Sequence, residues 1–297
     1  MTSLIFCVEP GVLYSQAVLL AESVNRYTAG FFNQMYAFSP RQNHQLNPVE
    51  KQKLKQLGVK LIDEPLNTQY LDYPIANKIL ACSWSEQNLA DEQLLMVDTD
   101  TIFLRPPEAL TAAGVDVFLR PVDRPGQASL GPGSTHENYW QKAHQLCQIP
   151  APEERVKTGV NLVPIRPYFN AGFVAYRRQL NLSDSWLQLL DTLRSHDHHP
   201  NNPRCLDQVT LAIATTDWSR EVLPHTYNYP LPLRSRMEDP AMQKLQLDDL
   251  VHVHYHRWFQ KPGFLDLLNP KLLPSEPLDW LYTRLPIEPL LDDHFPH

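Results

Sequence analysis

Glycine, cysteine and runs of positive charge are scarce in this 297-residue chain. It has only 10 glycines and no G-x-x-x-x-G-K-[ST], G-x-G-x-x-G or G-x-S-x-G motif. These absences argue against P-loop nucleotidases, typical dinucleotide enzymes and serine hydrolases. The 4 cysteines lie far apart without a C-x-x-C pair, so neither a disulfide framework nor a zinc ribbon is expected. Reduced cysteines are typical of a reducing compartment.

The chain also lacks a basic face and a long apolar run. Its formal net charge is −7, which argues against a general nucleic-acid binder, although a metal ion can still neutralise a bound diphosphate locally. Residues 1–8 lack the basic region and the length of a signal peptide, and no stretch is long enough to span a bilayer. We therefore expect a cytoplasmic protein without a transmembrane segment; this pattern does not test peripheral membrane association.

Strand and helix patterns alternate over the first 120 residues. Apolar runs predict strands at 4–8, 35–38, 59–62, 94–97 and 116–119. A helix is predicted to start at Asn47-Pro48-Val49-Glu50, which has an N-cap, a first-turn proline and a capping-box glutamate. Gly58 is expected to end it, and another helix is predicted over 74–87. This alternation predicts an α/β fold with a mostly parallel sheet, which binds ligands beyond the carboxyl ends of its strands.

The second half of the chain is less regular and rich in proline. Helices are predicted at 138–147, 185–193 and 207–214, and strands at 171–176 and 251–255. The 43% hydrophobic content is enough for one substantial core.

Asp98-Thr99-Asp100 directly follows the predicted strand at 94–97. Two carboxylates one residue apart can hold a hard divalent cation, which can bridge a diphosphate. The competing interpretation is a solvated turn, because a D-x-D tripeptide occurs by chance in an acidic chain. The preceding buried strand favours the metal site.

Three histidines occur at alternate positions in His252-Val253-His254-Tyr255-His256. In a strand their imidazoles would lie on one face, and one of them would be a suitable ligand for manganese or zinc. A histidine-rich edge packed on polar neighbours explains the pattern equally well. The motif also leaves a metal-dependent hydrolase open.

Several short motifs occur in an order that resembles GT-A fold glycosyltransferases, most closely the family 8 group that includes glycogenin. They are Asn77-Lys78-Ile79-Leu80-Ala81, Asp98-Thr99-Asp100, Phe169-Asn170-Ala171-Gly172-Phe173-Val174, Leu206-Asp207-Gln208, Leu223-Pro224 with Tyr227-Asn228, and Val253-His254-Tyr255 with Lys261-Pro262. The resemblance implies a GT-A-like domain over 1–262, with an acceptor-side insertion at 120–167 and a proline-rich C-terminal extension at 263–297 packed on it.

The resemblance also implies a role for each matching residue. Asp98, Asp100 and His254 would bind a divalent cation, Mn²⁺ or Mg²⁺, with Asp98 also reaching the donor ribose or sugar. Asn170, Asp207 and Gln208 would lie near the reacting sugar carbon. The other expected donor-binding residues are Lys78, Tyr14, Ala171, Gly172 and Lys261. The spacing from His254 to Lys261 is one residue longer than the family pattern and lacks its glycine, so His256 is the alternative metal ligand.

The function that follows is transfer of a hexose from a nucleotide diphosphate sugar, UDP by family analogy, with retained anomeric configuration. The acceptor, whether glycan, lipid or protein, is not specified by the sequence. Three alternatives stay open: a non-catalytic nucleotide-sugar or glycan-binding module, a metal-dependent hydrolase and a nucleotidyltransferase.

Overall fold

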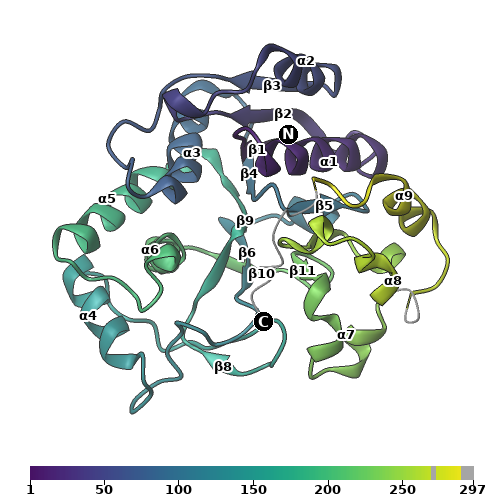
Figure 1. Cartoon of the computed structure of the whole chain (residues 1–297). Helices are drawn as coiled ribbons and strands as arrows, with labels where there is room; N and C mark the ends of the chain where they lie inside the picture. Colours follow the sequence, from purple (N-terminus) through teal and green to yellow (C-terminus); the bar gives the residue numbers. More distant parts are fainter. Residues whose placement is uncertain (269–271, 289–297) are drawn as a thin grey trace.

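A seven-stranded sheet with helices on both faces forms the centre of the computed structural model, which describes residues 1–268 and 272–288 (Figure 1). Its strands, in chain order, are β1 (Thr2–Cys7), β2 (Phe32–Phe38), β3 (Val59–Ile62), β4 (Gln93–Val97), β6 (Val117–Pro121), β9 (Phe169–Arg177) and β10 (Arg220–Val222). The spatial order is β10-β6-β9-β4-β1-β2-β3. A three-stranded sheet contains β11 (Tyr229–Pro230), β12 (His252–His254) and β5 (Thr101–Phe103). A two-stranded sheet contains β7 (Val156–Lys157) and β8 (Pro164–Ile165).

Two layers of helices cover the sheet: α1 (Val12–Tyr27), α2 (Pro48–Gln56), α3 (Asn77–Asn88), α4 (Glu137–Cys147), α5 (Leu182–Ser195) and α6 (Leu206–Ala214). The helices α7 (Pro240–Lys244), α8 (Phe264–Leu268) and α9 (Glu276–Arg284) belong instead to a third core cluster in the C-terminal part. Side chains of α3, α4, α5 and α6 belong to the core on one face, and side chains of α1 and α2 belong to the core on the other.

Successive side chains along each strand point alternately into one core and into the other. In β4, Leu94 and Met96 point into the first core, whereas Leu95 and Val97 point into the second. Successive side chains of a strand face opposite sides of a sheet. A continuous apolar run at 94–97 is therefore the pattern of a strand covered on both faces.

The prediction of a mostly parallel sheet is confirmed, with one exception. The pairs β1–β2, β1–β4, β2–β3 and β6–β10 are parallel, whereas β9 runs antiparallel to both β4 and β6. This places the start of β9, at Phe169, beside the carboxyl end of β6, at Pro121. Asn170-Ala171-Gly172 therefore enters the ligand-binding edge of the sheet.

Local sequence signals predicted several element boundaries well. Asn47 caps α2 through hydrogen bonds from the backbone N–H groups of Val49 and Glu50, and the Glu50 carboxylate accepts from the Asn47 N–H. Gly58 follows the helix with a φ of 79°, in the left-handed region that glycine adopts readily. The strand predicted at 59–62 corresponds to β3.

A third core cluster joins β5, β11 and β12 to the C-terminal helices. It includes Ile102, Val253, Tyr255, Phe259 and Leu281. The sequence did not predict β5, because a three-residue strand is too short to show a period.

The C-terminal helix α9 lies beside α1 (Figure 1). The Trp280 ring meets the Tyr27 ring edge-on, with 5.4 Å between ring centres, and ion pairs join Arg26 to Glu276 and Arg284 to Glu22. The division into a domain at 1–262 and an extension at 263–297 stays a prediction, and positions 269–271 and 289–297 of that extension lie outside the described residues. None of the described helices is both long and apolar enough to cross a membrane.

Candidate active site

A cavity of about 470 Å³ opens where β1 and β4 end side by side. The chain leaves β1 toward β2 and β3 on one side, while β4 lies on the other. Such a reversal of strand order leaves a crevice between two carboxyl ends, where α/β sheets bind ligands. Cys7 and Glu9 line the cavity from the β1 side, and Asp98 and Asp100 line it from the β4 side.

Asp98-Thr99-Asp100 forms the turn between β4 and β5 and is held by both neighbouring sheets. The Asp98 N–H donates to the Gly172 carbonyl at 3.0 Å, and the Tyr255 N–H donates to the Asp100 carbonyl at 3.1 Å. The Thr99 hydroxyl, which is buried, hydrogen-bonds the Gln16 amide oxygen at 3.1 Å. The two aspartates are therefore fixed by backbone contacts before any ligand binds.

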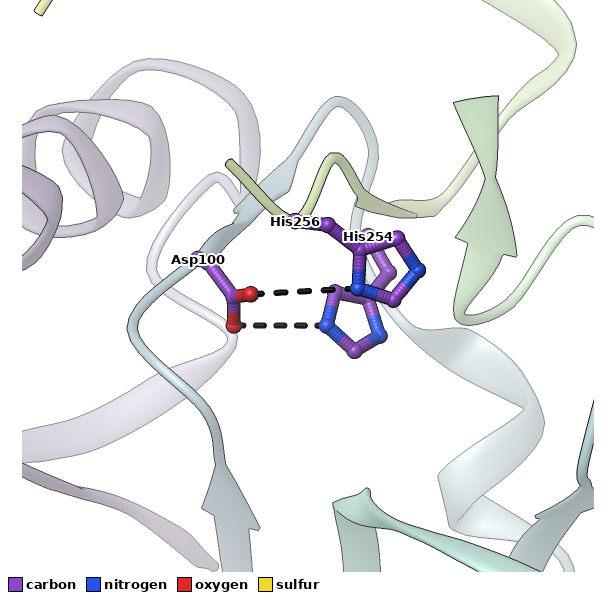
Figure 2. A group of neighbouring side chains, drawn as sticks. All are labelled: Asp100, His254 and His256. Carbon is purple, nitrogen blue, oxygen red and sulfur yellow. Dashed lines mark ion pairs between the residues drawn. The ribbon is translucent and has the colours of Figure 1, made fainter. Parts of the chain in front are cut away.

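Pairing between β5 and β12 brings the histidines to Asp100. The strands are antiparallel, with Thr101 opposite His254. The His254 Nε2 lies 3.3 Å from one Asp100 carboxylate oxygen, and the His256 Nδ1 lies 3.9 Å from the other. Figure 2 shows the two imidazole rings side by side, both directed at the Asp100 carboxylate. One ligand atom from each of these residues lies within 4.8 Å of the others, a spacing that a metal ion can bridge.

The charges of Asp100 and His254 favour each other. Burial disfavours ionised Asp100, but the charge of His254 and a hydrogen bond from it outweigh burial and lower the pKa of Asp100. Burial would lower the pKa of His254, but the charge of Asp100 raises it. The His254 Nδ1 has no hydrogen-bond partner in the described part of the chain.

The expectation that the three histidines share one strand face is wrong. The strand ends at His254, and His256 has a φ of 52°, in the left-handed region outside the strand. His252 is fully buried between Phe103 and Phe173, with ring centres 4.6 Å and 4.7 Å away. Two of the three histidines therefore lie at Asp100, and His252 is part of the core.

Asp98 faces a different partner from Asp100. The Lys78 ammonium lies 2.8 Å from an Asp98 oxygen, 3.5 Å from an Asp207 oxygen and 3.2 Å from the Ala171 carbonyl. Burial opposes the charge of Lys78, but the two carboxylates outweigh it and raise the pKa of the ammonium. Burial raises the pKa of Asp207, although Lys78 opposes this shift. The turn thus directs one aspartate to two histidines and the other to a lysine.

The start of β9 packs closely against Asp98. A methyl group on Gly172 would lie 2.7 Å from an Asp98 carboxylate oxygen and 2.8 Å from the Asn170 amide oxygen. The Asn170 oxygen accepts a hydrogen bond from the Gly172 N–H at 2.7 Å. Glycine is therefore needed here for close approach, since its φ is not in the left-handed region.

Two residues expected at the donor lie away from this cavity. Tyr14 borders a separate hollow with Arg284 and Ile287. The Lys261 ammonium lies 5.2 Å from the centre of the Trp258 ring, and Lys261 is not among the residues that line the cavity. Of the remaining expected residues, Lys78, Asp98, Asp100, Asp207 and Gln208 line it. The others, Asn170, Ala171, Gly172, His254 and His256, are not among its lining residues.

The cavity also includes residues that sequence reasoning missed. Arg257 and Gln260 line it from the segment after β12, and Arg204 lines it from the segment before α6. Arg257 and Arg204 are exposed, whereas Gln260 is buried and donates to the Glu288 carbonyl at 3.2 Å. Their proximity in the sequence could have identified the two arginines, because each lies within three residues of a predicted site residue.

Residues 4–218 match the family model of the Rhodobacterales glycosyltransferase domain. No curated protein sequence matches the chain. Among solved structures, mouse xyloside xylosyltransferase 1 in its apo form is 15% identical, with a TM-score of 0.49 over 86% of this chain and 97% of that one. The glycosyltransferase GlyE from Streptococcus pneumoniae is 14% identical, with a TM-score of 0.53 over 95% of this chain and 59% of that one.

The family model shows the class of enzyme, and the likeness to GlyE shows the fold. At such low identity the likeness to GlyE shows the fold alone, whereas the family model covers most of the chain, including Asp98, Asp100 and Asp207. His254, His256 and Arg257 lie beyond the matched residues. The chain is therefore a member of the Rhodobacterales glycosyltransferase domain family, a glycosyltransferase with a GT-A-like α/β fold.

Proposed function

We propose that this glycosyltransferase is metal-dependent and transfers a hexose from a nucleotide diphosphate sugar bound in the cavity at the end of β4. The observation that carries the proposal is the convergence of His254 and His256 on Asp100, which lines the same cavity as Asp98, Lys78 and Asp207. The first group is suited to a cation, and the second is suited to sugar hydroxyls.

The residues at Asp100 fit a divalent cation. One carboxylate and two imidazoles form a donor set that suits Mn²⁺ better than Mg²⁺, which prefers oxygen ligands. The buried His254 Nδ1 has no partner in the described part of the chain and Nε2 faces Asp100, so the ring is already turned toward the site. Asp98, also expected as a ligand from the sequence, pairs instead with Lys78. We assign Asp98 to the ribose or sugar of the donor.

The chemistry of transfer places negative charge on the leaving diphosphate. A bound divalent cation would stabilise that charge as a Lewis acid. The turn at 98–100 holds its two carboxylates in fixed positions, so little reorganisation is needed as charge develops. Lys78 keeps Asp98 and Asp207 in place, and Asp207 and Gln208 would bind hydroxyls of the transferred sugar. Asn170 and the backbone of Ala171 and Gly172 would face that sugar from β9.

The finer assignments rest on the resemblance to glycosyltransferase family 8. The order of motifs supports UDP as the nucleotide and retention of the anomeric configuration. The same order supports the segment at 120–167, which contains α4 and the β7–β8 pair, as the acceptor side. The acceptor would be a glycan, a lipid or a protein.

The experiment that tests this function is a screen of UDP- and GDP-sugars with and without Mn²⁺, read by thermal shift and by release of nucleoside diphosphate. We expect Mn²⁺-dependent stabilisation by one donor and its slow hydrolysis. Donor binding without turnover would indicate a binding module, and release of pyrophosphate would indicate a nucleotidyltransferase. Hydrolysis of other substrates without a nucleotide requirement would indicate a hydrolase.

A matched pair of variants isolates the metal site. Asp100→Ala should abolish Mn²⁺-dependent donor binding while the melting temperature without ligand changes little, because Asp100 lies at a turn rather than in the core. Asp248→Ala, at an exposed aspartate on another segment, should bind donor as the unmodified protein does. Unchanged Mn²⁺-dependent affinity in Asp100→Ala would contradict the assignment.

A further inference from the structure

His256 lies between two carboxylates that come from different parts of the chain. Its Nδ1 is 3.9 Å from Asp100, and its Nε2 is 3.9 Å from an oxygen of Asp123. Asp123 follows β6 and belongs to the segment at 120–167, whereas Asp100 belongs to the turn after β4. Each of the two imidazole nitrogens therefore has a carboxylate nearby.

The backbone at His256 is held in an uncommon conformation. Its φ of 52° lies in the left-handed region, which is unfavourable for a non-glycine residue. The chain adopts this conformation immediately after β12, and it places the His256 ring 4.0 Å from the His254 ring, centre to centre. The turn thus directs the His256 side chain toward Asp100, beside that of His254.

Asp123 is itself fixed by contacts within its own segment. The Val160 N–H donates to the Asp123 carbonyl at 2.8 Å, and the Gly159 N–H donates to the Val122 carbonyl at 2.9 Å. A methyl group on Gly159 would lie 3.4 Å from an Asp123 side-chain oxygen, so the two residues are in close contact. The carboxylate is therefore held at His256 by the strand-like pairing of 122–123 with 159–160.

We propose that Asp123 is a positioning residue for the metal site, acting through His256. A metal-binding histidine commonly donates its second ring N–H to a carboxylate, which fixes the tautomer and the ring orientation and makes the ligand nitrogen more basic. When the cation is bound, this 3.9 Å contact would shorten so that Asp123 accepts the Nε2 proton of His256 and Nδ1 binds the cation beside Asp100. The inference rests on the proposed metal dependence and connects the segment at 120–167 to the donor site.

The test is Mn²⁺ binding, measured by calorimetry without donor or turnover. Asp123→Ala should weaken Mn²⁺ binding about tenfold, within the range found for lost carboxylate partners of metal-binding histidines. Asp123→Asn, which keeps an acceptor oxygen, should recover part of this loss. Asp248→Asn serves as the surface control.

A double variant separates positioning from a general structural effect. In a His256→Ala background, Asp123→Ala should cause no further loss of Mn²⁺ affinity, because its route to the metal is already removed. Additive losses, or an Asp123→Ala variant that binds Mn²⁺ normally, would overturn the inference. Failure of the unmodified protein to bind Mn²⁺ at all would instead reject the proposed metal dependence, and the inference with it.

Discussion

The two histidines at Asp100 differ in burial and in distance to the carboxylate. His254 is 4% exposed and its Nε2 lies 3.3 Å from Asp100, whereas the His256 side chain is 38% exposed and 3.9 Å away. We predict that His254→Ala weakens Mn²⁺ affinity more than His256→Ala does, because a buried ligand in closer contact is more rigidly placed. Calorimetric titration of both variants measures the ranking. The opposite order would make His256 the principal imidazole ligand.

A second residue-scale prediction concerns which cationic side chain would bind the diphosphate of the proposed donor. Arg257 lines the cavity one residue after His256, whereas Lys261 lies over the Trp258 ring and outside the cavity lining. Arg257→Gln should weaken binding of the nucleoside diphosphate identified by the donor screen about tenfold, the effect of one charge-assisted hydrogen bond.

Lys261→Gln is the matched control, with an expected change below about twofold because Lys261 is not among the cavity-lining residues. Both variants are titrated with nucleoside diphosphate in Mn²⁺ and with the free nucleoside. Only the diphosphate affinity of Arg257→Gln should fall. A larger loss in Lys261→Gln would restore the role that the sequence assigned to Lys261.

At the scale of elements, one carboxylate at the start of α4 accepts hydrogen bonds from Arg166, the residue that follows β8. Glu137, the first residue of α4, accepts hydrogen bonds from Arg166, Ser129 and Gln141. The Arg166 hydrogen bond dominates, and together they lower the pKa of Glu137 from 4.5 to about 2, against the effect of burial. The segment at 120–167 is therefore held by a buried charge in addition to the contacts of Trp140, Ala143 and Ile165 with the main core.

This pKa predicts an acid-sensitive contribution to stability. Because the folded pKa is below the unfolded value, the contribution is complete above about pH 4.5 and is lost as the pH falls toward about 2. Glu137→Gln should lower the free energy of unfolding by about 2 kcal/mol at pH 7, and the difference from the unmodified protein should shrink at pH 3. Urea denaturation at both pH values measures it, with exposed Glu153→Gln as the control. A difference independent of pH would contradict the assignment.

At the scale of the whole molecule, the C-terminal helices share a core with β12, the strand that carries His254. Leu281 of α9 is fully buried in the cluster that contains Ile102 of β5 and Val253 of β12. Leu281→Ala should lower the free energy of unfolding by about 3 kcal/mol, the usual cost of such a cavity. Leu267→Ala, at a side chain that is 62% exposed, should have little effect.

The number of steps in the unfolding transition tests whether this C-terminal region unfolds together with the rest of the protein. We expect Leu281→Ala to unfold in one cooperative step at a lower denaturant concentration, since β5 and β12 connect this core to the turn at Asp100. Intrinsic fluorescence and circular dichroism should give the same midpoint. An early separate transition would show that the region after Pro262 unfolds independently, as a true extension would.

Local sequence patterns determined much of the fold. Apolar runs such as Leu94 to Val97 specify strands buried on both faces, and the Asn47 and Glu50 pair specifies a helix start, because both signals act within a few residues. The position of Asp98-Thr99-Asp100 after a buried strand was readable for the same reason. The fold class and the class of enzyme also followed from the order of short motifs.

Only the tertiary structure decided which of these site residues contact one another. The pairing of β5 with β12 joins positions more than 150 residues apart and brings His254 to Asp100. The left-handed turn at His256 removes it from the strand face predicted for it and places it between Asp100 and Asp123. Asp98 lies outside that group and pairs with Lys78. Sequence period specifies the direction of a side chain within its element, whereas the partner it meets depends on pairing between distant elements.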